Sequence, residues 1–342
     1  MTGIQQIARV TGLSKSTVSR ALRGLPGVSA ETTLTVKNVA DELGYIPSSA
    51  AAGLATGRHH AVGVVVPTIN RWFYMRALEG IDAELRRAGY DLILFNLGRP
   101  DGFQARGFHR SMLRQRVDAL VLLSLAFDDT EREQLHLTEY PVVIIGGPGP
   151  GIRHIGIDDD AAARLATRHL LDLGHRAIAH IGGYDEAGMN VAVPQERRRG
   201  FIAELATEGI AARDDWMLDG GFTFAGGYRA MQALLAGGDR PTAVFATSDE
   251  MAFGALTALR ETGLRVPDDV SVIGIDGHEY GPVVGLTTIA QSPSDQGATA
   301  TRALLSELAG GPRVDQFPAA DIELVDRGST APPRGAEPAA RP

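Results

Sequence analysis

The chain has 342 residues and a net charge of −8 at pH 7, with 44% hydrophobic residues, 22% charged residues and no cysteine. This length exceeds that of one ordinary core and indicates two or three globular domains. The lack of cysteine excludes a disulfide framework, thiol catalysis and thiolate metal sites. No apolar run reaches membrane-spanning length and no apolar leader precedes the first predicted helix, so we expect a cytoplasmic protein.

The stretch from Ile4 to Leu22 predicts two short helices joined at Gly12, a residue that permits a tight turn. Ser14 is placed to cap the second helix, in which Val18 and Leu22 lie four residues apart on one face. The first helix has the apolar members Ile7, Ala8 and Val10. Polar and cationic side chains are left for the remaining surface of the second helix: Lys15, Ser16, Thr17, Ser19, Arg20 and Arg23.

A helix surface of this kind suits the major groove of DNA, where Arg and Lys donate to guanine edges and hydroxyls contact phosphates or bases. The alternative is a surface helix of a small bundle with incidental charges. Residues 1–58 carry six cations and three anions, so this segment has a charge of +3 and the remainder has −11. A basic head on an acidic body confines the attraction for phosphate to one end of the chain.

A third helix is predicted from the cap Ser29 to about Gly44, and its apolar residues complete a three-helix core. These residues are Val36, Val39, Ala40 and Leu43. The Ala-rich stretch PSSAAAGLATGR begins at Pro47. By composition it is a flexible linker, since Gly53 weakens so short a helix by about 1 kcal/mol.

From Ala61 onward, apolar runs of strand length alternate with amphipathic segments of helix length. The expected strands lie at about 61–67, 90–96, 118–124, 141–147, 176–182, 242–247 and 269–275. The expected helices lie at about 72–88, 104–115, 129–137, 160–173, 195–208, 224–236 and 250–262. Continuous apolar strands covered by helices indicate parallel sheets, so the predicted fold class is α plus two α/β lobes. The Pro/Ala-rich residues 331–342 predict a disordered tail.

Four fragments stand in register near the N-terminus: TVSRAL at 17–22, VSAET at 28–32, ELGYIP at 42–47 and LATGR at 54–58. With this order and spacing the chain resembles the LacI/GalR family of bacterial transcription regulators. The resemblance continues to about residue 330, for example in SDEMAFGAL at 248–256 and VPDDVSVIGID at 266–276. It implies a helix-turn-helix domain at 1–46, a hinge at 47–59 and a two-lobe, periplasmic-binding-protein-like body at 60–330. The lobes would comprise about 60–158 with 290–320, and 159–289 with 321–330.

In this family the hinge forms a helix on operator DNA and inserts a leucine into the minor groove, and Leu54 matches that leucine. The family usually has Asn, Ala and Arg where this chain has Ser48, Ser49 and Ala52. Fewer polar contacts in the minor groove are therefore implied.

Ligands of two-lobe α/β bodies lie between the lobes, at the carboxyl ends of strands. Arg197, Asp249 and Asp276 are expected at such positions, and Arg197 and Asp276 match family positions that bind the effector. The alternative for this pair is a structural salt bridge. At Asp249 the resemblance is looser, because Ser248 stands where the family commonly has Asn.

Two aromatic residues after the first strand, Trp72 and Phe73, are candidates to lie against a sugar ring or a base. The alternative is that they pack the following helix onto the sheet. Asp158 matches a family Asp that caps the next helix. We therefore interpret Asp158 to Asp160 as the cap and the acidic first turn at the start of that helix.

No serine-hydrolase elbow, phosphate-binding P-loop or dinucleotide fingerprint occurs, so the sequence predicts no enzyme, no cofactor and no metal site. An exported solute-binding protein would share the two-lobe body but would lack a helix-turn-helix head. The resemblance implies a homodimeric repressor that binds a near-palindromic operator DNA. It also implies a small effector, a sugar, with a nucleobase or other metabolite as the alternative. Such a protein has no membrane partner and associates with the nucleoid when bound to operator.

Overall fold

The computed structural model describes residues 3–45, 58–98, 110–125, 129–149, 151–183 and 192–334. The chain divides into two compact units, Met1–His60 and Ala61–Pro342. Within the described ranges, no helix has the length and apolar character needed to cross a membrane. Leu54 and most of the predicted hinge lie outside the described residues, as do residues 335–342.

The first unit contains three helices, α1 (Ile4–Thr11), α2 (Lys15–Leu22) and α3 (Ala30–Glu42). They enclose a small core of Ile7, Ala8, Val18, Ala21, Val36 and Ala40. Val10, the third apolar residue named for this helix, is 59% exposed and lies outside the core. The buried face of α1 follows the helical spacing of Ile4, Ile7 and Ala8, and Val10 lies beside that face.

The second unit begins with a parallel sheet of order β2-β1-β3-β4-β5. Its strands are β1 (Ala61–Val66), β2 (Asp91–Asn96), β3 (Ala119–Leu123), β4 (Val142–Ile145) and β5 (His154–Ile155). One face packs on α5 (Trp72–Ala88) and α13 (Pro293–Leu308), and the other on α6 (Arg110–Leu113), α7 (Asp129–Leu135) and η2 (Leu137–Glu139). Because strand side chains alternate, Val64 joins the first cluster and Val65 the second. We call this part lobe 1.

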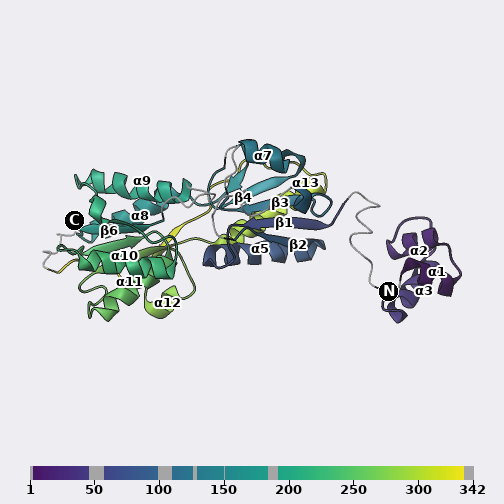
Figure 1. Ribbon diagram of the computed structural model, residues 1–342, viewed down its shortest axis with the longest axis horizontal. Helices are drawn as coiled ribbons and strands as arrows, with labels where there is room; N and C mark the ends of the chain where they lie inside the picture. Colours follow the sequence, from purple (N-terminus) through teal and green to yellow (C-terminus); the bar gives the residue numbers. More distant parts are fainter. Residues whose placement is uncertain are drawn as a thin grey trace. The chain divides into compact units, whose positions relative to one another are not determined.

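Lobe 2 contains a second sheet, of order β11-β10-β9-β8-β6-β7, in which only the β10–β11 pair is antiparallel. Its strands are β6 (Ile178–Gly182), β7 (Met217–Asp219), β8 (Ala243–Ala246), β9 (Ser271–Asp276), β10 (Thr287–Ala290) and β11 (Glu323–Val325). Helices α8 (Asp159–Asp172) and α9 (Ala192–Thr207) cover one face, and α10 (Phe224–Ala236) and α11 (Asp249–Glu261) the other (Figure 1). The short elements η3 (Asp214–Trp216) and α12 (Gly281–Val284) complete the lobe.

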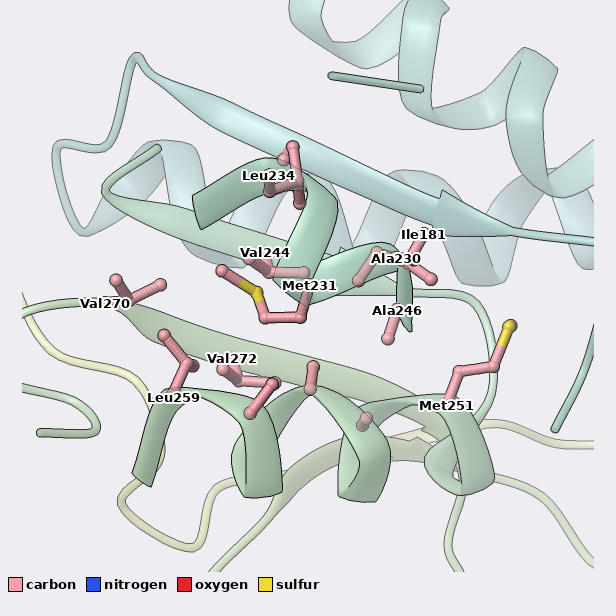
Figure 2. Close-up of a cluster of buried hydrophobic side chains, with 14 of the residues drawn as sticks. Ile181, Ala230, Met231, Leu234, Val244, Ala246, Met251, Leu259, Val270 and Val272 are labelled. Carbon is pink, nitrogen blue, oxygen red and sulfur yellow. The ribbon is translucent and has the colours of Figure 1, made fainter. Parts of the chain in front are cut away.

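The core under α10 and α11 shows how this lobe is held together. Met231 of α10 and Leu259 of α11 point toward the strands that carry Val244 and Val272 (Figure 2). All four side chains are fully buried. Burying an aliphatic side chain of this size contributes about 1.5–3 kcal/mol, so this layer fixes the ends of β8 and β9, from which polar side chains emerge.

The chain returns to lobe 1 after β10, because α13 packs along α5. The two helices touch through their backbones: a Cβ on Gly80 would lie 1.9 Å from the carbonyl oxygen of Ser294, and one on Gly297 would lie 2.3 Å from that of Ala77. Only glycine allows so close an approach. The position of α13 on lobe 1 is therefore tightly fixed.

The first residues of the predicted disordered tail are ordered. The carbonyl of Ala331 accepts from His175 and Ser271, and its N–H donates to Ser271 at 3.0 Å. Arg334 pairs with Asp269 at 2.8 Å. The prediction of disorder is wrong for these residues, because polar groups of lobe 2 bind their backbone and side chains.

Candidate functional site

The first candidate site is the exposed surface of α2. Gly12 has the left-handed conformation, with φ of 69°, that ends α1, and Ser14 then accepts the N–H of Thr17 at 3.0 Å. This serine cap satisfies a backbone donor at the start of α2. Val18 and Ala21 point into the core, so the opposite surface of α2 is left to polar side chains.

The polar residues predicted to read DNA lie on this surface. Lys15, Ser16, Arg20 and Arg23 are exposed, and Thr17 and Ser19 are partly buried. Arg20 donates to the carbonyl of Pro26, and Arg23 donates through Nε to that of Ser19 at 3.1 Å. Since a guanidinium has five N–H donors, one such bond leaves others for a base or a phosphate.

The second candidate site is a cavity in the second unit, lined by residues of both lobes. Lobe 1 contributes Arg71, Phe73 and Ser124, and lobe 2 contributes Arg197, Phe222, Ser248, Glu250 and Asp276. Gln291, which follows β10, and Gln296 of α13 also line the cavity. With Tyr74, the cavity thus joins three aromatic side chains to several polar groups.

Arg197 lies in the cavity wall, 5% exposed, on α9. Its Nε donates to Asp159 at 2.8 Å, and Nη1 donates to the carbonyl of Thr247, which follows β8. Burial raises the pKa of Asp159, and the neighbouring Arg197 charge opposes that shift. Arg197 therefore forms a salt bridge with Asp159 and not with Asp276, and both partners of that bridge line the cavity.

Asp276 ends β9 in the same cavity, with a φ of 138° that is strained for a residue with a Cβ. Its Oδ1 accepts from Gln291 Nε2 at 2.9 Å. Burial raises its pKa, and Arg197 opposes that rise. Strained, buried carboxylates of this kind cluster at functional sites.

Asp249 does not line the cavity. Its carboxylate accepts from the N–H of His278 at 2.8 Å and from the hydroxyl of Thr288 at 2.7 Å, and it is fully buried. Its sequence neighbours Ser248 and Glu250 line the cavity instead. Successive residues of a helix point about 100° apart, so at the start of α11 the prediction falls one residue away from the wall.

Trp72 and Phe73 have different roles. Phe73 lines the cavity, whereas Trp72 stacks on His278 with ring centroids 5.0 Å apart and donates through Nε1 to Glu279. Arg71 lines the cavity and donates to the carbonyl of Gly221 at 3.1 Å. Arg71 and Trp72 therefore tie the start of α5 in lobe 1 to lobe 2.

The sequence did not predict several of the residues that line the cavity. Ser124 follows β3, Phe222 follows β7 and Gln291 follows β10, so all three obey the rule that ligand residues lie at the carboxyl ends of strands. Applying that rule to every strand would have found Ser124.

Glu250 has a pKa raised to about 7, mainly by burial and further by Asp276.

Asp158 caps α8 as predicted, because its side chain accepts the N–H of Ala161 at 2.9 Å. Among the residues that the structure describes, no group of three His, Asp or Glu side chains is arranged to hold a metal ion.

Comparisons with known proteins match both parts of the chain. Residues 3–48 match the family described as bacterial regulatory proteins, lacI family, and residues 167–330 match the periplasmic binding protein-like domain. The HTH-type transcriptional repressor PurR of Mannheimia succiniciproducens is 33% identical over 314 residues, which span 90% of this chain and 92% of that protein.

Two solved structures extend the similarity to the fold. The lac repressor dimer bound to operator and the anti-inducer ONPF has a TM-score of 0.84 at 27% identity, covering 96% of this chain and 99% of that chain. The transcriptional regulator CelR in complex with cellobiose has a TM-score of 0.69 at 30% identity, covering 96% and 100%. The chain therefore belongs to the LacI family of bacterial regulatory proteins and is a DNA-binding transcription repressor, not an enzyme.

Proposed function

We propose that this repressor binds a near-palindromic operator as a homodimer and that a sugar in the cavity between its lobes controls the binding. The observation that carries the proposal is the pairing of a polar helix surface in the first unit with a two-lobe cavity in the second. A single short helix contacts few bases, so useful specificity needs two half-sites.

The cavity has the chemistry that a sugar requires. Asp276, Glu250, Ser124 and Ser248 offer acceptors for hydroxyl groups, and Phe73 can lie against the apolar face of a ring. The similarity to a regulator solved with cellobiose also supports a sugar. A buried hydroxyl without a partner costs about 1–3 kcal/mol, so such a wall favours ligands with many donors.

A nucleobase is the second candidate, and one observation favours it. Phe73 and Phe222 come from different lobes and line the same cavity, so a planar ring can contact both. A thermal-shift screen of sugars and nucleobases distinguishes the two classes, because a ligand that binds only the folded state raises its melting temperature.

The homodimer is supported by exposed apolar side chains on the second unit. Tyr280, Val283 and Val284 around α12 are 61%, 80% and 51% exposed, and Met75 on α5 is 49% exposed. We propose that a second copy of the chain covers these residues, as a protein that reads a two-fold operator requires. In sedimentation equilibrium, Val283→Asp should shift a wild-type dimer toward monomer, and an unchanged mass would exclude this surface.

Selection of binding sites from random duplex DNA tests the operator proposal. The full chain should enrich a two-fold symmetric site with two half-sites. Enrichment of sites without two-fold symmetry would contradict the dimeric mode of reading.

A further inference from the structure

A chain of hydrogen bonds crosses one wall of the cavity from lobe 2 to lobe 1. Gln296 of α13 donates through Nε2 to Gln291 Oε1 at 3.0 Å, and Gln291 donates through its own Nε2 to Asp276 Oδ1 at 2.9 Å. All three residues line the cavity. The chain thus links the end of β9 to a helix that belongs to lobe 1.

The carboxylate at one end sets the direction of every bond in this chain. An ionised Asp276 can only accept, so Gln291 must present its NH₂ group to Asp276 and its oxygen to Gln296. Gln296 must then give its own NH₂ group to Gln291. Reversing either amide would place two acceptors against each other. The Gln296 carbonyl is therefore left over as an acceptor.

This carbonyl oxygen has no hydrogen-bond partner among the described residues, although Gln296 is only 1% exposed. A buried acceptor without a partner is costly, and native proteins retain few of them. The adjacent Gly297 fits against the backbone of Ala77, so the turn of α13 that carries Gln296 is held in place. Gln296 cannot easily move to find another partner.

We propose that Gln296 determines specificity in this cavity by accepting a hydrogen bond from a hydroxyl or ring N–H of the effector. The proposal rests on the proposed function of the cavity as an effector site. The ligand class that it selects is an uncharged molecule with donors at two places, one for Asp276 and one for Gln296. A ligand bound at both places completes a continuous set of hydrogen bonds between lobe 2 and α13.

The ligand-free protein provides the first test. Gln296→Met and Gln296→Leu keep a similar volume and remove both the unpartnered acceptor and the donor to Gln291, so the gain and the loss largely offset each other. The melting temperature of the full chain should therefore stay within about 2 °C of wild type. Gln232→Met changes an exposed glutamine of α10 and should leave the melting temperature unchanged. A melting temperature lower by about 5 °C or more in both Gln296 variants would show that the side chain is structural and would overturn the proposal.

Ligand binding provides the second test, by isothermal titration of the full chain with cellobiose, D-ribose and hypoxanthine. For a probe that binds wild type, either Gln296 variant should weaken binding about tenfold or more, and Gln232→Met should not. Equal affinity in wild type and the Gln296 variants would overturn the proposal. If none of the probes binds wild type, that result counts against the proposed sugar or nucleobase effector, and the melting temperatures alone decide the role of Gln296.

Discussion

We expect Arg20 of α2 to read a base, since it is exposed and a guanidinium can donate twice to guanine. Arg20→Ala should cost about 1–3 kcal/mol of specific binding and relax the preference at one operator position. Lys37→Ala removes the same charge from the exposed surface of α3 and should leave the base preference intact. Site selection with both variants measures this, and an unchanged preference in the Arg20 variant would exclude it from base reading.

Glu250 gives the cavity a pH dependence whose sign follows from its raised pKa of about 7. An unfolded glutamate titrates near 4.5, so the folded state holds the proton more tightly, and stability falls as the pH rises from about 4.5 through 7. Glu250→Gln should therefore lose less stability than wild type between pH 5 and pH 8. Melting temperatures at both pH values test this, with Glu323→Gln on the surface as control, and parallel profiles for all three proteins would refute it.

For the cavity, the sequence correctly predicted some lining residues that end a strand or begin a helix. The prediction failed where the direction of a side chain depends on how its helix packs against the rest of the fold. Arg197, Asp276 and Phe73 line the cavity. Asp249 and Trp72 do not, because the start of α11 directs Asp249 toward Thr288 and the start of α5 directs Trp72 toward His278. No pattern in the sequence records which of two adjacent side chains faces a cavity.

At the scale of elements, the amphipathic period of α5 and the continuous apolar runs of β1 and β3 predicted these elements to within one or two residues. The sequence did not predict helix α13 or the strands β5, β7, β10 and β11. These strands have two to four residues each, and so short a run has no measurable period. Long apolar strands are specified by their own composition. Short edge strands form because a neighbouring strand already offers its backbone groups.

The contacts between the start of α5 and lobe 2 are expected to hold the two lobes together. Trp72→Ala removes the stack on His278 and the bond to Glu279, so it should increase the open population about tenfold, as a loss of about 1.4 kcal/mol implies. Since the chain has no native cysteine, fluorophores on Arg86→Cys and Arg260→Cys would report the distance between the lobes. Transfer efficiency should fall in the Trp72 variant and fall less in Trp72→Phe. Identical efficiencies in all three proteins would show that these contacts do not hold the lobes.

At the scale of the whole molecule, the polar surface of α2 and the two-lobe cavity lie in separate units of the chain. Closure of two lobes on a ligand changes the angle between them, and in a dimer such a change alters the spacing of the two hinge segments. The ligand can therefore control DNA binding without touching DNA. A substitution in the cavity should then abolish the response to ligand and leave operator binding unchanged.

Operator titration of wild type and Asp276→Ala, each with and without the ligand identified by the thermal-shift screen, tests this separation most directly. Asp276 lies in the cavity wall of the second unit and takes no part in the polar surface of α2. We expect the variant to bind operator like wild type without ligand and to show no response when ligand is added. A full ligand response in the variant, or a loss of operator binding without ligand, would contradict the account.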